Sequence, residues 1–197
     1  MHAKQVNIAD CVIVQPGFSI KGALKHDPHG THQVLMSKHL RAGERYRYQK
    51  DDELRIIPER AVDNYLLKPG QILFMSRGVG NYAVLLEDLP LLSIATLTFF
   101  ILTARPNVDP EYLVWYLNQA PFQAQLNEMR TGASTPMIPR KDFCAAPIPL
   151  PPLERQREIA QLGNLIAKEK RLLRQLQEET EYRERLLGTK IVRALMK

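Results

Sequence analysis

The chain has 197 residues and an ordinary globular composition, with 45% hydrophobic and 24% charged residues. This length suits one sizeable domain with an appendage and is short for two full domains. The 27 Lys and Arg residues exceed the 21 Asp and Glu residues, and the formal net charge of +6 favours a polyanionic partner. The longest uncharged apolar run, residues 91–104, is too short to span a bilayer, and the N-terminus has no hydrophobic signal region. We therefore expect no membrane association and a cytoplasmic protein.

Residues 1–105 are predicted to be rich in strands. Short apolar or alternating runs are separated by Gly, Pro, Asn and Asp, as in strands joined by tight connections. Two runs in LKPGQILFMSRGVGNYAVLL should form a hairpin whose loop, SRGVGN, supplies glycines for positive φ. Residues 91–104 should hold a buried strand pair. The predicted strands are Cys11–Gln15, His32–Met36, Gln71–Met75, Tyr82–Leu86 and Leu97–Leu102.

Two short helices should follow the strands. Asp109 is a good N-cap residue, Pro110 suits the first helical position, and Glu111 suits the positive end of the helix dipole. Pro121 should open the second helix in the same way.

Four prolines, Pro147, Pro149, Pro151 and Pro152, precede a long segment with a coiled-coil spacing of apolar residues. We expect a stiff extended strap, with Pro151 or Pro152 in the first turn of the helix that follows. A helix of about 40 residues would be about 60 Å long and could not bury its whole apolar stripe on this domain, so it needs a partner helix. The predicted contact residues are Ile159, Leu162, Ile166, Leu173, Leu176 and Leu187.

These patterns predict an α+β fold. Residues 1–150 should form a strand-rich domain with small helices, and residues 151–197 should form one long helix that pairs with a partner as a coiled coil.

The segment Ser37–Lys50 is the densest basic region of the predicted domain, with Glu44 as its one acidic residue. Arginine can bond guanine or clamp phosphate, and tyrosine can pack on sugar or bond phosphate. An extended conformation would place Arg45 and Arg47 on one face. The alternative is an ordinary solvated loop. The candidate DNA-contact residues here are Lys38, Arg41, Arg45, Tyr46, Arg47, Tyr48 and Lys50.

Two further loops could approach DNA. Glycines in SRGVGN would allow close backbone contact, and the small and hydroxyl residues of GASTPM, residues 132–137, could bind phosphate. Plain structural turns are the alternative for both loops. The candidates are Ser76, Arg77, Asn81, Thr131, Ser134 and Lys141.

No catalytic or metal-binding motif is evident. His26, His29 and His32 surround a turn, but no Cys or carboxylate pattern accompanies them. The acidic residues 51–53 are contiguous and do not suggest converging nuclease ligands, and base-flipping, dinucleotide and Walker motifs are missing. Cys11 and Cys144 stand alone and are expected to be buried thiols. We expect a chain without catalytic residues, metal or cofactor.

Residues 111–160, EYLVWYLNQAPFQAQLNEMRTGASTPMIPRKDFCAAPIPLPPLERQREIA, resemble the specificity (S) subunit of type I restriction–modification systems. The resemblance is carried by a YLxxxLN helix, a second helix around PFQ, the Gly-Ala-Ser-Thr-Pro loop and the PIPLPPLExQ start of the long helix. The segment LKPGQILFMSRGVGNYAVL resembles the Gly-Asp-Ile-Leu hairpin of the same family, with Gln71 where Asp is usual.

The resemblance implies a non-catalytic target-recognition domain that reads a DNA half-site and directs a separate adenine methyltransferase, and a restriction subunit where one accompanies it. S-adenosylmethionine would be bound by the methyltransferase. Family members usually carry two such domains and two helices. A half-size chain would therefore form a homodimer through antiparallel helices and recognise an inverted repeat in double-stranded DNA. The rival interpretation is a coiled-coil adaptor whose globular end binds protein.

Overall fold

The computed structural model describes residues 3–20, 22–132 and 134–196. Strand-rich sheets and small helices are followed by one long C-terminal helix, so the predicted α+β class is confirmed. The chain divides into two compact units, residues 1–160 and 161–197. The first unit thus includes the beginning of the long helix.

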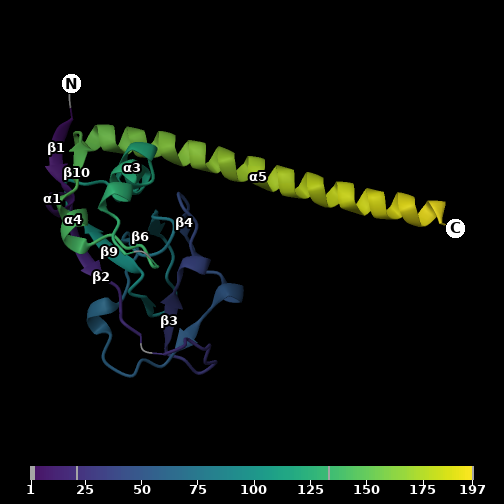
Figure 1. The fold of residues 1–197 in the computed structure, drawn as a ribbon, viewed down its shortest axis with the longest axis horizontal. Coiled ribbons are helices and arrows are strands. Elements are labelled where there is room, and N and C mark those ends of the chain that lie inside the picture. Colours follow the sequence, from purple (N-terminus) through teal and green to yellow (C-terminus); the bar gives the residue numbers. More distant parts are fainter. Residues whose placement is uncertain (1–2, 21, 133, 197) are drawn as a thin grey trace. The chain divides into compact units, whose positions relative to one another are not determined.

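A five-stranded sheet, with strand order β2-β9-β6-β7-β4, lies at the centre of the first unit (Figure 1). Neighbouring strands are antiparallel, except that β4 runs parallel to β7. The predicted hairpin is confirmed as β6 and β7, with Leu73 opposite Val84. The five strands are β2 (Val12–Pro16), β9 (Phe99–Ala104), β6 (Ile72–Met75), β7 (Ala83–Leu86) and β4 (Arg45–Tyr46).

Side chains of this sheet alternate between two buried faces. Phe74 and Leu102 pack on one face, whereas Leu73 and Ile101 pack on the other. Alternation is the rule in a strand, and because both faces are covered the strands appear in the sequence as continuous apolar runs.

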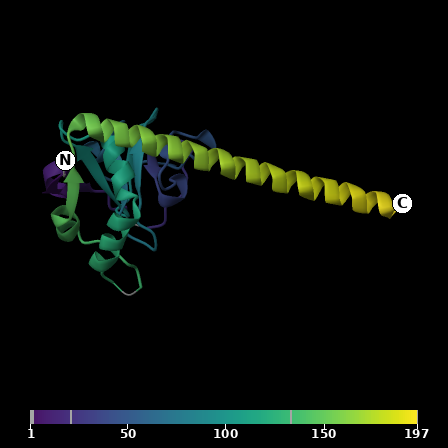
Figure 2. The ribbon, with the colours of Figure 1, turned by 90° about the horizontal axis from the view of Figure 1, so that it is seen from above.

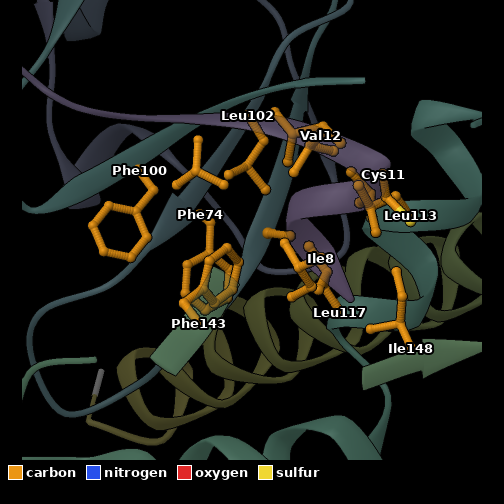
Figure 3. Packing of buried hydrophobic residues seen from close by; sticks show 14 of the residues in the cluster. Ile8, Cys11, Val12, Phe74, Phe100, Leu102, Leu113, Leu117, Phe143 and Ile148 are labelled. Carbon is orange, nitrogen blue, oxygen red and sulfur yellow. The ribbon is translucent and has the colours of Figure 1, made fainter. Parts of the chain in front are cut away.

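Short helices cover the first of these faces. Phe143 stacks on Phe74 with ring centroids 4.4 Å apart, and Phe100 lies beside both rings (Figure 3). The Asp109 carboxylate accepts hydrogen bonds from the backbone N–H groups of Glu111 and Tyr112, which confirms the predicted N-cap. The helices are α1 (Ile8–Cys11), α2 (Pro110–Leu117), α3 (Ala120–Met129) and α4 (Arg140–Ala145).

A second sheet, with strand order β5-β3-β8, contains part of the predicted strand pair. Residues 91–104 do hold two buried strands, β8 (Ser93–Ala95) and β9, but β8 pairs with β3 and β9 pairs with β2 and β6. The expected pairing between them was therefore wrong. The remaining elements of this region are β3 (His32–Leu35), β5 (Arg55–Ile56), η1 (Ser37–His39), η2 (Lys50–Asp52) and η3 (Asp63–Tyr65).

The proline strap is extended, as predicted, and is also a strand. Residues Pro147–Leu150 form β10, which pairs antiparallel with β1 (Lys4–Asn7). The carbonyl of Pro149 accepts a hydrogen bond from the Tyr112 hydroxyl at 2.6 Å. Prolines at alternate positions suit an edge strand, because only every second residue must donate to the neighbouring strand.

Helix α5 (Leu153–Leu195) runs for 43 residues without interruption (Figures 1 and 2). At this length it extends about 65 Å. Pro151 and Pro152 lie before the helix and not in its first turn, so that detail of the prediction was wrong; the Pro152 carbonyl accepts a hydrogen bond from the Gln156 N–H at 3.0 Å. None of the helices in the described part of the chain is long and apolar enough to cross a membrane.

Candidate nucleic-acid interface

The basic segment Ser37–Lys50 comprises η1, a turn and strand β4, followed by the start of η2. Three of its basic side chains are exposed and have no ion-pair partner among the described residues. These three are Lys38, Arg41 and Lys50.

Strand β4 shows the predicted alternation of arginine and tyrosine. Tyr46 is 7% exposed, and its hydroxyl accepts a hydrogen bond from the Gln33 side chain at 2.9 Å. Tyr46 was expected to contact DNA, and its burial corrects this prediction. The parallel pairing of β4 with β7 directs the Tyr46 side chain into the core. The arginines on either side of it lie on the opposite face.

Carboxylates hold both of these arginines. Glu87 forms ion pairs with Arg45 and Arg47, and Arg45 also pairs with Glu111 of α2. The hydrogen bond from Arg47 lowers the pKa of Glu87, and the same bond raises the pKa of Arg47. The sequence did not predict either residue as a partner of these arginines, since Glu87 and Glu111 lie far from the basic segment in the chain.

Tyr48 is half-buried and is also engaged within the fold. Its hydroxyl donates a hydrogen bond to Glu53, which raises the pKa of Tyr48 and lowers that of Glu53. Glu53 also pairs with Arg55. Within the described ranges, no three His, Cys, Asp or Glu residues are grouped so that they could hold a metal ion.

The two further candidate loops lie side by side. The backbone N–H of Gly78 donates to the Pro136 carbonyl at 2.9 Å, and that of Ile138 donates to the Ser76 carbonyl at 2.8 Å. Gly78 has a φ of 105°, as the glycine-rich loop predicted. The hairpin loop and residues 131–138 therefore form one braced surface.

Two polar residues of the hairpin loop shape this surface from within. Ser76 is 1% exposed and its hydroxyl donates to the Thr98 carbonyl. Asn81 is 7% exposed; it donates to the Met75 carbonyl and accepts two hydrogen bonds from Arg130, at 2.8 and 3.0 Å. Ser76 and Asn81 were expected at the DNA surface, and their burial corrects this. Arg130, which sequence reasoning missed, supports the loop through Asn81.

The accessible candidates of these loops are Arg77, Thr131, Ser134 and Lys141, of which Arg77 is partly buried and the others exposed. The Tyr82 hydroxyl donates to the Ser37 carbonyl at 3.3 Å, so the basic segment meets the hairpin at the start of β7. The hairpin of β6 and β7, with its loop, therefore contacts both the basic segment and residues 131–138. Among the candidate DNA-contact residues, five cations have no ion-pair partner within the described part of the chain. They are Lys38, Arg41, Lys50, Arg77 and Lys141, and we call these the five unpaired cations.

The predicted helix contacts lie along α5. Ile159 belongs to the first unit and is half-buried, whereas the other five predicted residues are between 42% and 65% exposed. Residues 177–185 are polar except for Tyr182 and interrupt the apolar stripe, which resumes at Leu186. Further exposed apolar residues that widen the stripe are Leu165, Leu172, Leu186, Ile191, Val192 and Leu195.

Gln156 is a buried polar residue whose role sequence reasoning missed. It is 1% exposed, accepts from the Asp109 N–H at 2.8 Å, and donates to the carbonyls of Asn107 and Pro151 at 3.1 and 2.8 Å. One side chain thus joins the cap of α2, the loop before it and the end of the proline strap. The signal in the sequence was the PIPLPPLExQ motif that carries the resemblance, because Gln156 is its glutamine.

Both cysteines are free thiols. Cys11 is fully buried, as predicted, and burial raises its pKa to about 11. Cys144 was also expected to be buried, but it is only partly buried, and it packs against the edge of the main core.

No family model and no curated protein sequence matches the chain, but solved structures do. A chain from a structure on complex assembly and conformational transition of the type I R-M system matches 90% of this chain, with a TM-score of 0.66 and 21% identity. The HsdS subunit from Thermoanaerobacter tengcongensis matches 88%, with a TM-score of 0.62 and 19% identity. The chain has the fold of type I specificity subunits. The type I restriction-modification system S subunit from M. genitalium matches 81%, with a TM-score of 0.53 and 13% identity. The chain spans only 37% to 41% of the length of these three chains.

Proposed function

We propose that this chain is the DNA sequence-recognition subunit of a type I restriction–modification system. The observation that carries the proposal is the structural match to specificity subunits over 81% to 90% of the chain. The resemblance of residues 111–160, found independently in the sequence, supports it. In this role the chain is not an enzyme and directs a separate adenine methyltransferase, and a restriction subunit where one accompanies it.

The surface around β7 is the proposed DNA-reading surface. The five unpaired cations can contact phosphates without first breaking an ion pair, and the exposed hydroxyl of Ser134 can donate to a phosphate oxygen. The exposed Thr131 hydroxyl donates to the Met137 carbonyl at 3.4 Å and would exchange this bond for one to a phosphate. Burial removes Tyr46, Ser76 and Asn81 from this surface.

The apolar stripe of α5 is the proposed homodimer interface. A helix of this length with exposed leucines and isoleucines at coiled-coil spacing gains stability by pairing with a second copy. Two copies related by a two-fold axis present two identical reading surfaces, so the proposed target is an inverted repeat in double-stranded DNA. The same helices would dock the methyltransferase subunits.

Salt dependence of DNA binding tests the proposal against a protein-binding adaptor. Five phosphate contacts per copy predict that the logarithm of the association constant falls with the logarithm of salt with a slope of about −4.5 per half-site. Arg41→Ala and Lys141→Ala should each reduce this slope by about 0.9. Lys170→Ala, which removes a charge from α5, is the matched control and should leave the slope unchanged. An adaptor would bind DNA neither tightly nor with this slope.

Sedimentation equilibrium tests the dimer. Leu173→Asp places a charge in the stripe and should yield monomers that bind a single half-site, whereas Gln175→Asp, on an exposed polar position, should remain dimeric. A wild-type chain that is monomeric at high concentration would refute the proposed arrangement. Separately, methylome sequencing of cells with and without the gene should show a bipartite adenine methylation site that is present only with the gene.

A further inference from the structure

Two arginines of the basic segment are held by carboxylates in different ways. Glu87 accepts a hydrogen bond from Arg45 Nη1 at 3.1 Å with one oxygen, and from Arg47 Nε at 2.6 Å with the other. The second terminal nitrogen of Arg45, Nη2, donates to Glu111 at 2.7 Å. Both terminal nitrogens of Arg45 are therefore engaged within the protein, whereas Arg47 is held only through Nε.

The terminal nitrogens of Arg47 remain available for a ligand. Its side chain is 71% exposed, and within the described part of the chain its hydrogen bond is the one from Nε to Glu87. A guanidinium presents its two terminal nitrogens as a planar fork. On double-stranded DNA, the base edge with two neighbouring acceptors is that of guanine, whose O6 and N7 lie in the major groove.

The surroundings of Arg47 favour a base edge over a phosphate. Glu87 and the adjacent Asp88 directly follow β7, and both carboxylates raise the pKa of the Arg47 guanidinium. A phosphate brought to Arg47 would be repelled by these two carboxylates, whereas a base edge carries no net charge. The bond to Glu87 also restricts the arginine side chain before DNA arrives, which lowers the entropy cost of binding.

We propose that Arg47 reads a guanine through a bidentate contact with O6 and N7, and that Glu87 positions Arg47 for this contact. Arg45 then braces Glu87 against α2 without touching DNA. This inference rests on the proposed function, because it requires the edge formed by β4 and β7 to face the major groove. Arg47 would decide one base of each half-site, and a homodimer would read that base twice.

The test begins with selection of a target from random duplexes by the full-length wild-type chain. Each guanine of the selected target is then replaced in turn by 7-deazaguanine, which lacks the N7 acceptor. At one guanine per half-site, wild-type affinity should fall about ten-fold, within the range of a lost bidentate contact. Arg47→Ala should bind the two duplexes equally, and its salt slope should match that of the wild type.

Two further variants separate reading from charge and from folding. Arg47→Lys keeps the charge but not the planar fork, so it should discriminate less well at that base than the wild type and keep the salt slope. Glu87→Gln should lower the ratio of specific to non-specific affinity and raise non-specific affinity, because it removes a negative charge beside the DNA. A purely structural role for Glu87 would lower both affinities together.

Several results would overturn the inference. Arg47→Ala that weakens binding to all sequences equally and reduces the salt slope by about 0.9 would make Arg47 a phosphate contact. A selected half-site without guanine, or equal sensitivity of wild type and Arg47→Ala to 7-deazaguanine, would also refute base reading by Arg47 while leaving the proposed function intact. Failure of the wild type to select any DNA would refute both.

Discussion

Replacing Gln156 by alanine tests the joint between helix α2, the proline strap and the start of α5. The substitution removes three hydrogen bonds and leaves the Asp109 N–H and the carbonyls of Asn107 and Pro151 without their partner. One such hydrogen bond contributes about 1 kcal/mol net to stability, so the loss of three gives about 3 kcal/mol. We expect Gln156→Ala to lower the free energy of unfolding by about this amount.

Urea unfolding at a fixed protein concentration measures the effect. Gln161→Ala is the matched control, since Gln161 is an exposed glutamine on the same helix, and its free energy of unfolding should change by less than about 0.5 kcal/mol. Gln156→Glu should be at least as destabilising as Gln156→Ala at neutral pH, because a carboxylate cannot donate to the two carbonyls. If Gln156→Ala and Gln161→Ala unfold at the same urea concentration, the three hydrogen bonds do not hold this joint together.

Three other properties can be tested on the same protein. The hydrogen bond from Arg47 lowers the pKa of Glu87, so the stabilisation by the ionised carboxylate is present above the ordinary pKa of 4.5 and is lost as pH falls through the lowered value. Glu87→Gln should therefore lose less stability than the wild type between pH 6 and about pH 3. Urea midpoints at the two pH values would show this difference. Asp109→Ala should cost about 1 kcal/mol by removing the α2 cap, and Asp109→Asn should cost much less, which thermal unfolding would show. Iodoacetamide at pH 8 should modify Cys144 before Cys11, because burial raises the pKa of Cys11 to about 11, and peptide mass mapping would reveal the order.

The elements that the sequence predicts well are those with a strong local signal. All five predicted strands are present, with ends within two residues of their expected positions, because each is an apolar run bounded by turn residues. The Asp109 cap was equally predictable, since the cap, Pro110 and the first turn lie next to one another. Strand β10 was predicted only as an extended strap, because its partner β1 lies at the other end of the chain and prolines disfavour strands.

The candidate site was predictable as a region, while the roles of its residues depended on pairing between distant segments. Local composition located the basic segment and both loops. Whether Tyr46 faces the core or the solvent depends on the parallel pairing of β4 with β7, whose partner residues lie 40 positions away in the chain. The same pairing brings Glu87 to Arg45 and Arg47, so their partners could not be inferred from the basic segment alone.

The ion pairs of the basic segment distinguish cations that would attract DNA of any sequence from an arginine that would discriminate between bases. The five unpaired cations can attract any DNA sequence, and their contribution falls steeply with salt. In the proposed role, Arg47, whose charge is balanced by Glu87, would add little to that general attraction and would instead discriminate between bases. One copy of the chain, with few phosphate contacts, would bind its half-site weakly at physiological salt. A dimer would double the number of contacts without changing the DNA-binding surface of either copy. Helix α5 would therefore supply affinity through dimerisation, while the carboxylate-held arginine supplies selectivity.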